Sequence, residues 1–325
     1  MRQPGTTNSH NENGRSRARV PPVLALGLGI FAASTSSILV RFAQIDAPSL
    51  VIAAYRLLIA SLILAPFLFR QRVKLREVST GQYKLAVLSG LFLALHFGTW
   101  ITSLEYTSVT SSVVLVQTTP LFVAALSPLL LGEKPSGRTL IGLGLAFGGG
   151  LLIAFSDFCV FSDGFLCAAA ASGNGTNVLL GDFLALLGGA TGAAYLIIGR
   201  RLRSDLSLLI YIGLVYSSAA IFLTIAVISF GYHLFGYPAI TYLWFLLLAI
   251  IPQLIAHSTY NWALRYLPAT KVSITLLGEP ISAAVLAYLV LGELPSPLRI
   301  AGAGIVLFGV ASAVFRTDSG EITTD

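Results

Sequence analysis

Two residues of opposite charge lie deep within apolar stretches of the sequence, where charges are otherwise rare. Arg56 stands inside the stretch 49–69, and Glu279 stands midway along 269–291. An unpaired charge within a membrane costs ~2.5 kcal/mol or more. Arg56 is therefore predicted to bind a substrate carboxylate or phosphate, or to neutralise an acid. Glu279 is predicted to bind cationic groups or to carry a proton during turnover. The alternatives are an arginine and a glutamate that only stabilise helix ends.

Each of two apolar stretches contains a proline directly after a polar residue. Pro120 follows Thr119, and Pro280 follows Glu279. Proline lacks a backbone donor and disfavours helix at the residue before it, so both positions predict a structural kink. Hydroxyl and amide side chains gather where backbone groups are freed, and this makes Gln117 and Thr119 candidate substrate-binding residues.

Polar aromatic residues recur in two other apolar stretches. His96 and Trp100 are four residues apart and share one helical face, and His257, Tyr260 and Asn261 form a similar face further along the chain. Such walls suit a substrate with an apolar body and polar ends. The competing interpretation is that these side chains join helices by hydrogen bonds.

The sequence carries no pattern typical of a metal, nucleotide or catalytic site. It has no clustered His, Cys, Asp and Glu set, and no glycine-rich phosphate loop between a strand and a helix. We therefore expect no metal, no cofactor and no enzymatic activity.

The elements that must position these residues are membrane-spanning helices. The chain is 55% hydrophobic and only 10% charged, which excludes a soluble globule. Its apolar runs are continuous, which excludes a β-barrel. We predict an all-α polytopic protein in a lipid bilayer, without a nucleic-acid partner. The ten expected transmembrane helices are 22–40, 49–69, 85–104, 107–131, 139–155, 179–199, 207–229, 241–263, 269–291 and 299–315.

The distribution of positive charge predicts the orientation of these helices. All but three of the 20 Lys and Arg residues fall on one side, the exceptions being Arg41, Arg56 and Arg299. Cytoplasmic segments collect such residues, so both termini are expected in the cytoplasm and the protein in the inner or plasma membrane. The ends, 1–20 and 317–325, are polar and are predicted to be disordered cytoplasmic tails.

One long connection, 156–178, is predicted to be extracytoplasmic. It contains Cys159 and Cys167, which either form a disulfide or stay unpaired. It also contains a glycosylation sequon at Asn174, relevant only in a eukaryotic secretory pathway.

The sequence repeats itself at an offset of 160 residues. The range 106–155 aligns with 266–315 without a gap, and the identical pairs include Pro120 with Pro280 and the Leu-Gly-Glu triplets ending at Glu133 and Glu293. A unit of five helices enters its second copy from the opposite face of the membrane. We therefore expect two inverted five-helix repeats, 21–155 and 179–316, with alternating access to a site between them.

The repeated segments resemble a known family. The ranges 107–133 and 268–293, with Arg56 in Ala-Ala-Tyr-Arg-Leu-Leu, are similar to the EamA-type ten-helix members of the drug/metabolite transporter superfamily. The resemblance implies transport of a small molecule, such as an amino acid, another metabolite, a sugar nucleotide or a drug.

The expected function is a secondary transporter for a small organic metabolite, either an amino acid or a related compound, or a drug in efflux. Proton coupling or exchange is the expected driving force. The alternative is a membrane-embedded enzyme or a lipid-linked-sugar flippase factor. Glycines at 142, 144, 148, 302, 304 and 309 predict close helix packing, either within the chain or in a homodimer.

Overall fold

The protein was examined as a computed structural model. The structure describes residues 20–107, 109–161, 165–167, 177–279, 281–282 and 297–314. The predicted tails, apart from Val20, and the sequon at Asn174 lie outside these residues.

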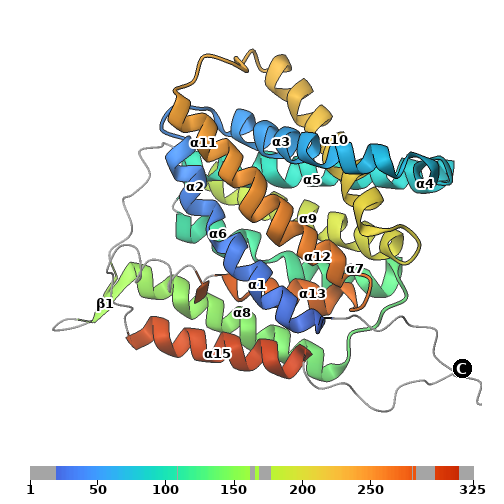
Figure 1. Ribbon diagram of the computed structural model, residues 1–325. Helices are drawn as coiled ribbons and strands as arrows, with labels where there is room; N and C mark the ends of the chain where they lie inside the picture. Colours follow the sequence, from blue (N-terminus) through green and yellow to red (C-terminus); the bar gives the residue numbers. More distant parts are fainter. Residues whose placement is uncertain are drawn as a thin grey trace, which may run out of the picture.

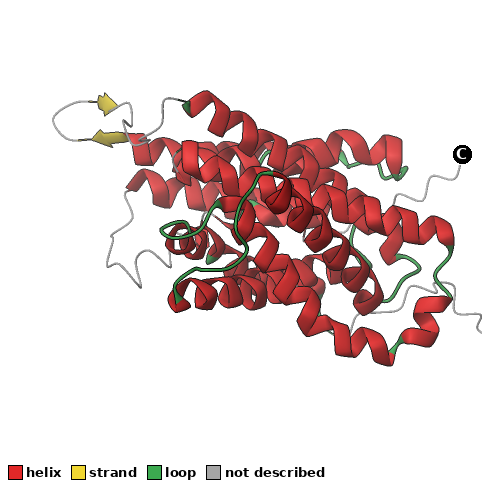
Figure 2. Ribbon diagram, turned by 90° about the horizontal axis from the view of Figure 1, so that it is seen from above, coloured by secondary structure: helices red, strands yellow, loops and turns green. Residues whose placement is uncertain are grey.

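The described residues form helices throughout, with one small hairpin at the end of the bundle (Figures 1 and 2). The first half contains α1 (Pro22–Ser34), α2 (Ser36–Ala43), α3 (Ser49–Arg70), α4 (Arg72–Arg76), α5 (Thr80–Tyr106), α6 (Val109–Val116), α7 (Thr119–Leu130) and α8 (Gly137–Phe158). The hairpin is β1 (Cys159–Phe161) and β2 (Phe165–Cys167). The second half contains α9 (Val178–Arg203), α10 (Leu208–Ser229), α11 (Ala239–Leu248), the π-helix η1 (Ala249–His257), α12 (Ser258–Ala263), α13 (Ala269–Leu276) and α15 (Pro297–Val314).

Seven helical segments in the described part of the chain are long and apolar enough to cross a membrane. They are Pro22–Ala43, Ser49–Arg70, Thr80–Tyr106, Ser112–Leu130, Val178–Arg203, Leu208–Ser229 and Ala239–Ala263. Each overlaps one of the stretches predicted from hydropathy. Two shorter apolar helices, Gly137–Leu152 and Ile300–Ala313, overlap two more.

Local sequence explains where several helices begin and end. Ser79 starts α5 with a capping box, in which its hydroxyl accepts from the Gln82 N–H and the Gln82 side chain accepts from the Ser79 N–H. Ser207 caps α10 in the simpler way, by accepting from Ile210. After α7, Gly132 has a φ of 68°, a left-handed conformation that glycine adopts without strain.

Several predicted spans are interrupted near the middle of the bundle. The first is divided at Thr35, between α1 and α2. The fourth is divided at Gln117 and Thr118, directly before Pro120 in the first turn of α7, where the kink was predicted. In the ninth, α13 ends at Leu276, and a turn at 277–278 precedes Glu279. Pro280 lies outside the described residues.

The two halves of the chain pack along each other rather than standing apart. α5 lies against α9, α3 against α10, α1 against η1, α7 against α13, and α8 against α15. Figure 1 shows the last pair side by side at the lower edge of the bundle. The apolar core therefore consists largely of contacts between the halves.

Glycines allow α8 and α15 to approach closely. A Cβ on Gly142 would lie 2.6 Å from the Gly309 carbonyl oxygen, and one on Gly149 would lie 2.8 Å from that of Gly302. These glycines thus serve packing within the chain. A Cβ on Gly144, Gly148 or Gly304 would meet nothing within 4 Å.

The segment predicted as an extracytoplasmic loop contains the short antiparallel hairpin of β1 and β2. Cys159 is paired with Cys167 in its register. Their side chains lie outside what the structure describes, so the disulfide stays a prediction.

Candidate functional site

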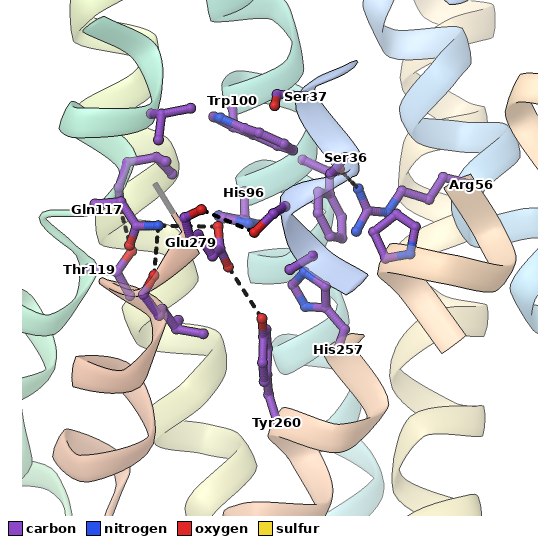
Figure 3. A pocket seen from close by; sticks show the side chains of 17 residues that line it. Ser36, Ser37, Arg56, His96, Trp100, Gln117, Thr119, His257, Tyr260 and Glu279 are labelled. Atoms are coloured by element: carbon purple, nitrogen blue, oxygen red, sulfur yellow. Dashed lines mark hydrogen bonds between the residues drawn. The ribbon is translucent and has the colours of Figure 1, made fainter. Parts of the chain in front are cut away.

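A cavity lies where the interrupted helices meet, and it is lined by residues from both halves of the chain (Figure 3). The centres of water-sized molecules can occupy about 90 Å³ inside it. Eight of the nine residues predicted to bind substrate line it: Arg56, His96, Trp100, Gln117, Thr119, His257, Tyr260 and Glu279.

Arg56 projects from α3 and is almost fully buried, with 1% of its surface exposed. Its Nε donates to Gln253 Oε1 at 2.9 Å, and its Nη1 donates to Ser36 Oγ at 2.9 Å. The guanidinium carbon lies 4.0 Å from the centre of the Phe97 ring, a cation–π contact. These contacts fix the side chain, yet Nη2 donates to no described residue.

Glu279 is held separately, beside the interruption in the fourth span. Its Oε2 accepts from Gln117 Nε2 at 3.1 Å, and its Oε1 accepts from the Tyr260 hydroxyl at 3.3 Å. The Ser34 hydroxyl donates to the Glu279 backbone carbonyl at 3.1 Å. No ion pair joins Glu279 to Arg56, although both line the same cavity. Figure 3 shows them on opposite sides of the view.

Gln117 and Thr119 sit at the interruption itself and are nearly fully buried. Gln117 also donates to the Leu276 carbonyl at 3.1 Å, and the Thr119 hydroxyl donates to the Gly189 carbonyl at 3.0 Å. Hydrogen bonds thus join the interruption between α6 and α7 to α13 and to α9. Freed backbone groups and polar side chains meet here, as expected for a break that lines a cavity.

Aromatic rings form the wall between the two charges. The rings of His96 and Trp100 lie nearly parallel, with centroids 6.3 Å apart, and His257 contacts Phe97 edge to face at 5.0 Å. His96 Nδ1 donates to the Gly188 carbonyl at 2.8 Å, which fixes its ring. Trp100 Nε1 and His257 Nδ1 are buried and have no hydrogen-bond partner among the described residues.

Asn261 differs from the expectation that it belongs to this wall. It does not line the cavity. Its Nδ2 donates to the Tyr195 hydroxyl at 2.5 Å and to the His257 carbonyl at 2.8 Å. Residues 260 and 261 are about 100° apart on a helix, so Tyr260 faces the cavity while Asn261 faces α9. Asn261 therefore joins helices, which was the competing interpretation.

Reasoning from the sequence missed several residues of the site. Ser34, Ser36 and Ser37 line the cavity, and Gln253 holds Arg56 from behind. A signal was present, since Ser34 to Ser37 are four consecutive hydroxyl residues inside an apolar span. The apolar lining residues, such as Phe97 and Leu276, carry no signal that separates them from the core.

A second polar cluster links the halves away from the cavity. Glu133, which follows α7, forms an ion pair with Arg200 at 2.6 Å. Its other oxygen accepts from the Ala269 N–H at 3.2 Å and so caps α13. Arg200 also donates to the Leu264 carbonyl at 2.7 Å. Glu133 of the first half therefore caps a helix of the second half.

The arrangement of the cavity suits binding of an organic molecule rather than of a metal ion. Among the described residues, no group of three His, Cys, Asp or Glu side chains lies close enough to hold a metal. The lining instead offers one fixed cation, one carboxyl group and several aromatic rings.

Comparisons with known proteins agree with this architecture. The model of the EamA-like transporter family matches residues 21–155 and again 179–315. Two proteins of Archaeoglobus fulgidus, each described as an uncharacterized transporter, are 26% and 22% identical to this chain. In both cases the match covers 89% of this chain and 94% of the relative.

A solved crystal structure superposes with a TM-score of 0.71, at 15% sequence identity. The match covers 90% of this chain and 96% of that one, and it supports the fold alone. The helices long enough to span a bilayer and the two family matches together make this an integral membrane protein. The chain belongs to the EamA-like transporter family.

Proposed function

We propose that the protein is a secondary transporter that moves a small organic metabolite, an amino acid or a related compound, by alternating access. One observation carries the proposal. Residues distant in sequence, from both halves of the chain, converge on one cavity at the points where helices are interrupted. Transporters place their substrate sites at such interruptions near the bilayer midplane.

The proposal includes ten spans arranged as two inverted repeats, 21–155 and 179–316. The 160-residue offset relates α5 to the segment that contains η1, and it relates α9 to the segment that contains α1. The packing of α5 on α9 therefore corresponds to that of η1 on α1, and both contacts are present. The pairs α3 with α10 and α8 with α15 turn into themselves. The interruptions at 117–118 and 277–278 are related by the same 160-residue offset. These regularities support the repeat.

Glu279 is the proposed proton-coupling residue. Its counterpart at the 160-residue offset is Thr119, so the second half has a carboxyl group where the first half has a neutral hydroxyl. Glu279 lines the cavity and is hydrogen-bonded to Gln117 and Tyr260, which come from different halves. A change in its protonation would therefore alter contacts between the halves.

The charge distribution supports a location in the inner or plasma membrane with both termini in the cytoplasm. On this topology, the Glu133–Arg200 cluster lies on the cytoplasmic side and the hairpin of β1 and β2 on the other side.

Counterflow in proteoliposomes tests the proposed function. Vesicles containing the purified protein are loaded with one unlabelled metabolite at a time, and uptake of the same labelled compound is measured. We expect saturable uptake that depends on internal substrate for at least one amino acid or related metabolite. Absence of counterflow for every metabolite, together with chemical conversion of a compound, would replace the transporter with a membrane-embedded enzyme.

A further inference from the structure

The cavity is lined by an arginine and a glutamate that form no ion pair with each other. Arg56 is fixed by Gln253, Ser36 and Phe97, and Glu279 is fixed by Gln117 and Tyr260. Each side chain therefore has its own set of partners, and no ion pair forms between them. A cavity with separated and fixed charges is preorganised for a ligand that supplies both countercharges.

The side of the cavity around Arg56 offers hydrogen-bond donors, which suit a negatively charged group of a ligand. Nη2 of Arg56 is without a partner among the described residues. Ser36 accepts from Arg56, so its own proton is free to be donated. We define this pair, Arg56 and Ser36, as the donor pole.

The side around Glu279 has the opposite character. The carboxyl group accepts one hydrogen bond at each oxygen, and a carboxylate oxygen can accept more than one. We define Glu279 with Gln117 and Tyr260 as the acceptor pole. Between the poles lie aromatic rings, including Phe97 and His257, which suit an apolar ligand body.

Charge balance selects among ligands for this arrangement. When Glu279 is deprotonated, a zwitterion adds one negative charge beside Arg56 and one positive charge beside Glu279, so every charge has a partner. A phosphate would leave excess negative charge in a cavity that contains a carboxyl group, and an amine without an acid would leave Arg56 unpaired. Unpaired charges within a membrane protein are costly.

We propose that the cavity binds a small zwitterion in one orientation, with its carboxylate on the donor pole and its ammonium group on the acceptor pole. This inference rests on the proposed transport function and adds to it the orientation of the substrate and the two residues that determine specificity. Arg56 selects for the carboxylate and Glu279 selects for the ammonium group.

The first stage of the test separates this inference from the transport function. Counterflow is measured with the twenty proteinogenic L-amino acids, with 5-aminopentanoate as a longer zwitterion, and with matched monocarboxylates, amines and sugar phosphates. We expect counterflow with at least one zwitterion. Counterflow only with compounds that are not zwitterions would overturn the inference and leave the transporter intact. No counterflow with any compound would overturn both.

The second stage uses the best zwitterion and two derivatives, its carboxamide and its N-acetyl form. In the wild type, both derivatives should compete at least about tenfold more weakly than the parent, because each leaves one buried charge unpaired. In Arg56→Gln, the parent and the carboxamide should compete equally, while the N-acetyl form stays weaker. In Glu279→Gln, the N-acetyl form should equal the parent, while the carboxamide stays weaker.

Controls keep the outcome interpretable. Arg41→Gln and Glu77→Gln change exposed charges outside the cavity, and both should retain the two wild-type ratios. A purely structural role for Arg56 would weaken all three ligands alike without changing their ratios, and that result would contradict the proposal. If Arg56→Gln does not fold, Arg56→Lys replaces it. Its ammonium group keeps the charge, so the preference for the parent over the carboxamide should shrink but persist.

Discussion

Glu279 is the residue at which protonation and transport are expected to meet. Glu279→Gln mimics the protonated side chain, so the dependence of transport rate on pH should be lost. The measurement is the initial rate of counterflow across a pH series in proteoliposomes. Glu77→Gln, at an exposed position, is the control and should keep the wild-type profile. A Glu279→Gln protein with unchanged pH dependence would exclude this residue from coupling.

Ser36 is expected to stabilise the protein through its bond to Arg56. Ser36→Ala removes the acceptor of Nη1 and leaves a buried charged donor without its partner, which should cost about 1–3 kcal/mol. Thermal unfolding in detergent should show a lower midpoint. Ser37→Ala is the matched control, because Ser37 lines the same cavity but forms no hydrogen bond to a described residue. Equal midpoints for the two variants would refute the role.

The sequence predicts individual site residues best where polar residues interrupt apolar stretches. Arg56 and Glu279 stand out because a charge within a span needs a partner, and both line the cavity. It could not identify Gln253 as the partner of Arg56, because the two residues are 197 positions apart in the chain. Asn261 illustrates a second limit, since one step along a helix separates a cavity wall from a helix contact.

The packing of α8 on α15 depends on glycines at which a side chain would collide with the backbone of the other helix. Gly142→Ala would place a Cβ 2.6 Å from the Gly309 carbonyl oxygen, forcing the helices apart at a cost of about 1–3 kcal/mol. Gly144→Ala is the matched control on the same helix, because its Cβ would meet nothing within 4 Å. Thermal midpoints of the two variants are compared. A Gly142→Ala protein as stable as Gly144→Ala would argue against this close contact.

Glu133 joins α13 to the end of α9 in two separable ways. Glu133→Gln keeps an oxygen to accept from Ala269 but loses the charge facing Arg200, whereas Glu133→Ala loses both. The ion pair is partly exposed and worth at most about 1 kcal/mol. Loss of the cap adds about 0.5–2 kcal/mol. Unfolding midpoints should therefore fall in the order wild type, Glu133→Gln, Glu133→Ala, and the reverse order of the two variants would contradict the capping role.

Hydropathy located the seven long apolar helical segments of the described residues, but it located the interruptions within them less well. Pro120 predicted a break at the right place, because proline removes a backbone donor. The division at Thr35 and the π-helix over Ala249–His257 were not predicted. Both depend on how neighbouring helices pack, and π-helices have no simple sequence signature.

The orientation of the whole molecule can be tested with thiol labelling. Cys159 and Cys167 are replaced by serine, and single cysteines are introduced at Glu77 or Phe235, which are exposed between spans. In intact cells, a membrane-impermeant reagent should label the cysteine at 235 and not the one at 77. Permeabilised cells serve as the control and should show labelling at both. Labelling at 77 alone in intact cells would invert the proposed topology.

The crossing of α8 and α15 bears on the direction of transport. At the 160-residue offset, Gly142 corresponds to Gly302 and Gly149 corresponds to Gly309. The contact of Gly142 with Gly309 therefore corresponds to that of Gly302 with Gly149, and both contacts are present. In the proposed alternating-access mechanism, this pair of contacts maps onto itself and so favours neither the inward-open nor the outward-open state. On the proposed mechanism, any such bias originates at positions where the halves differ, such as Thr119 against Glu279.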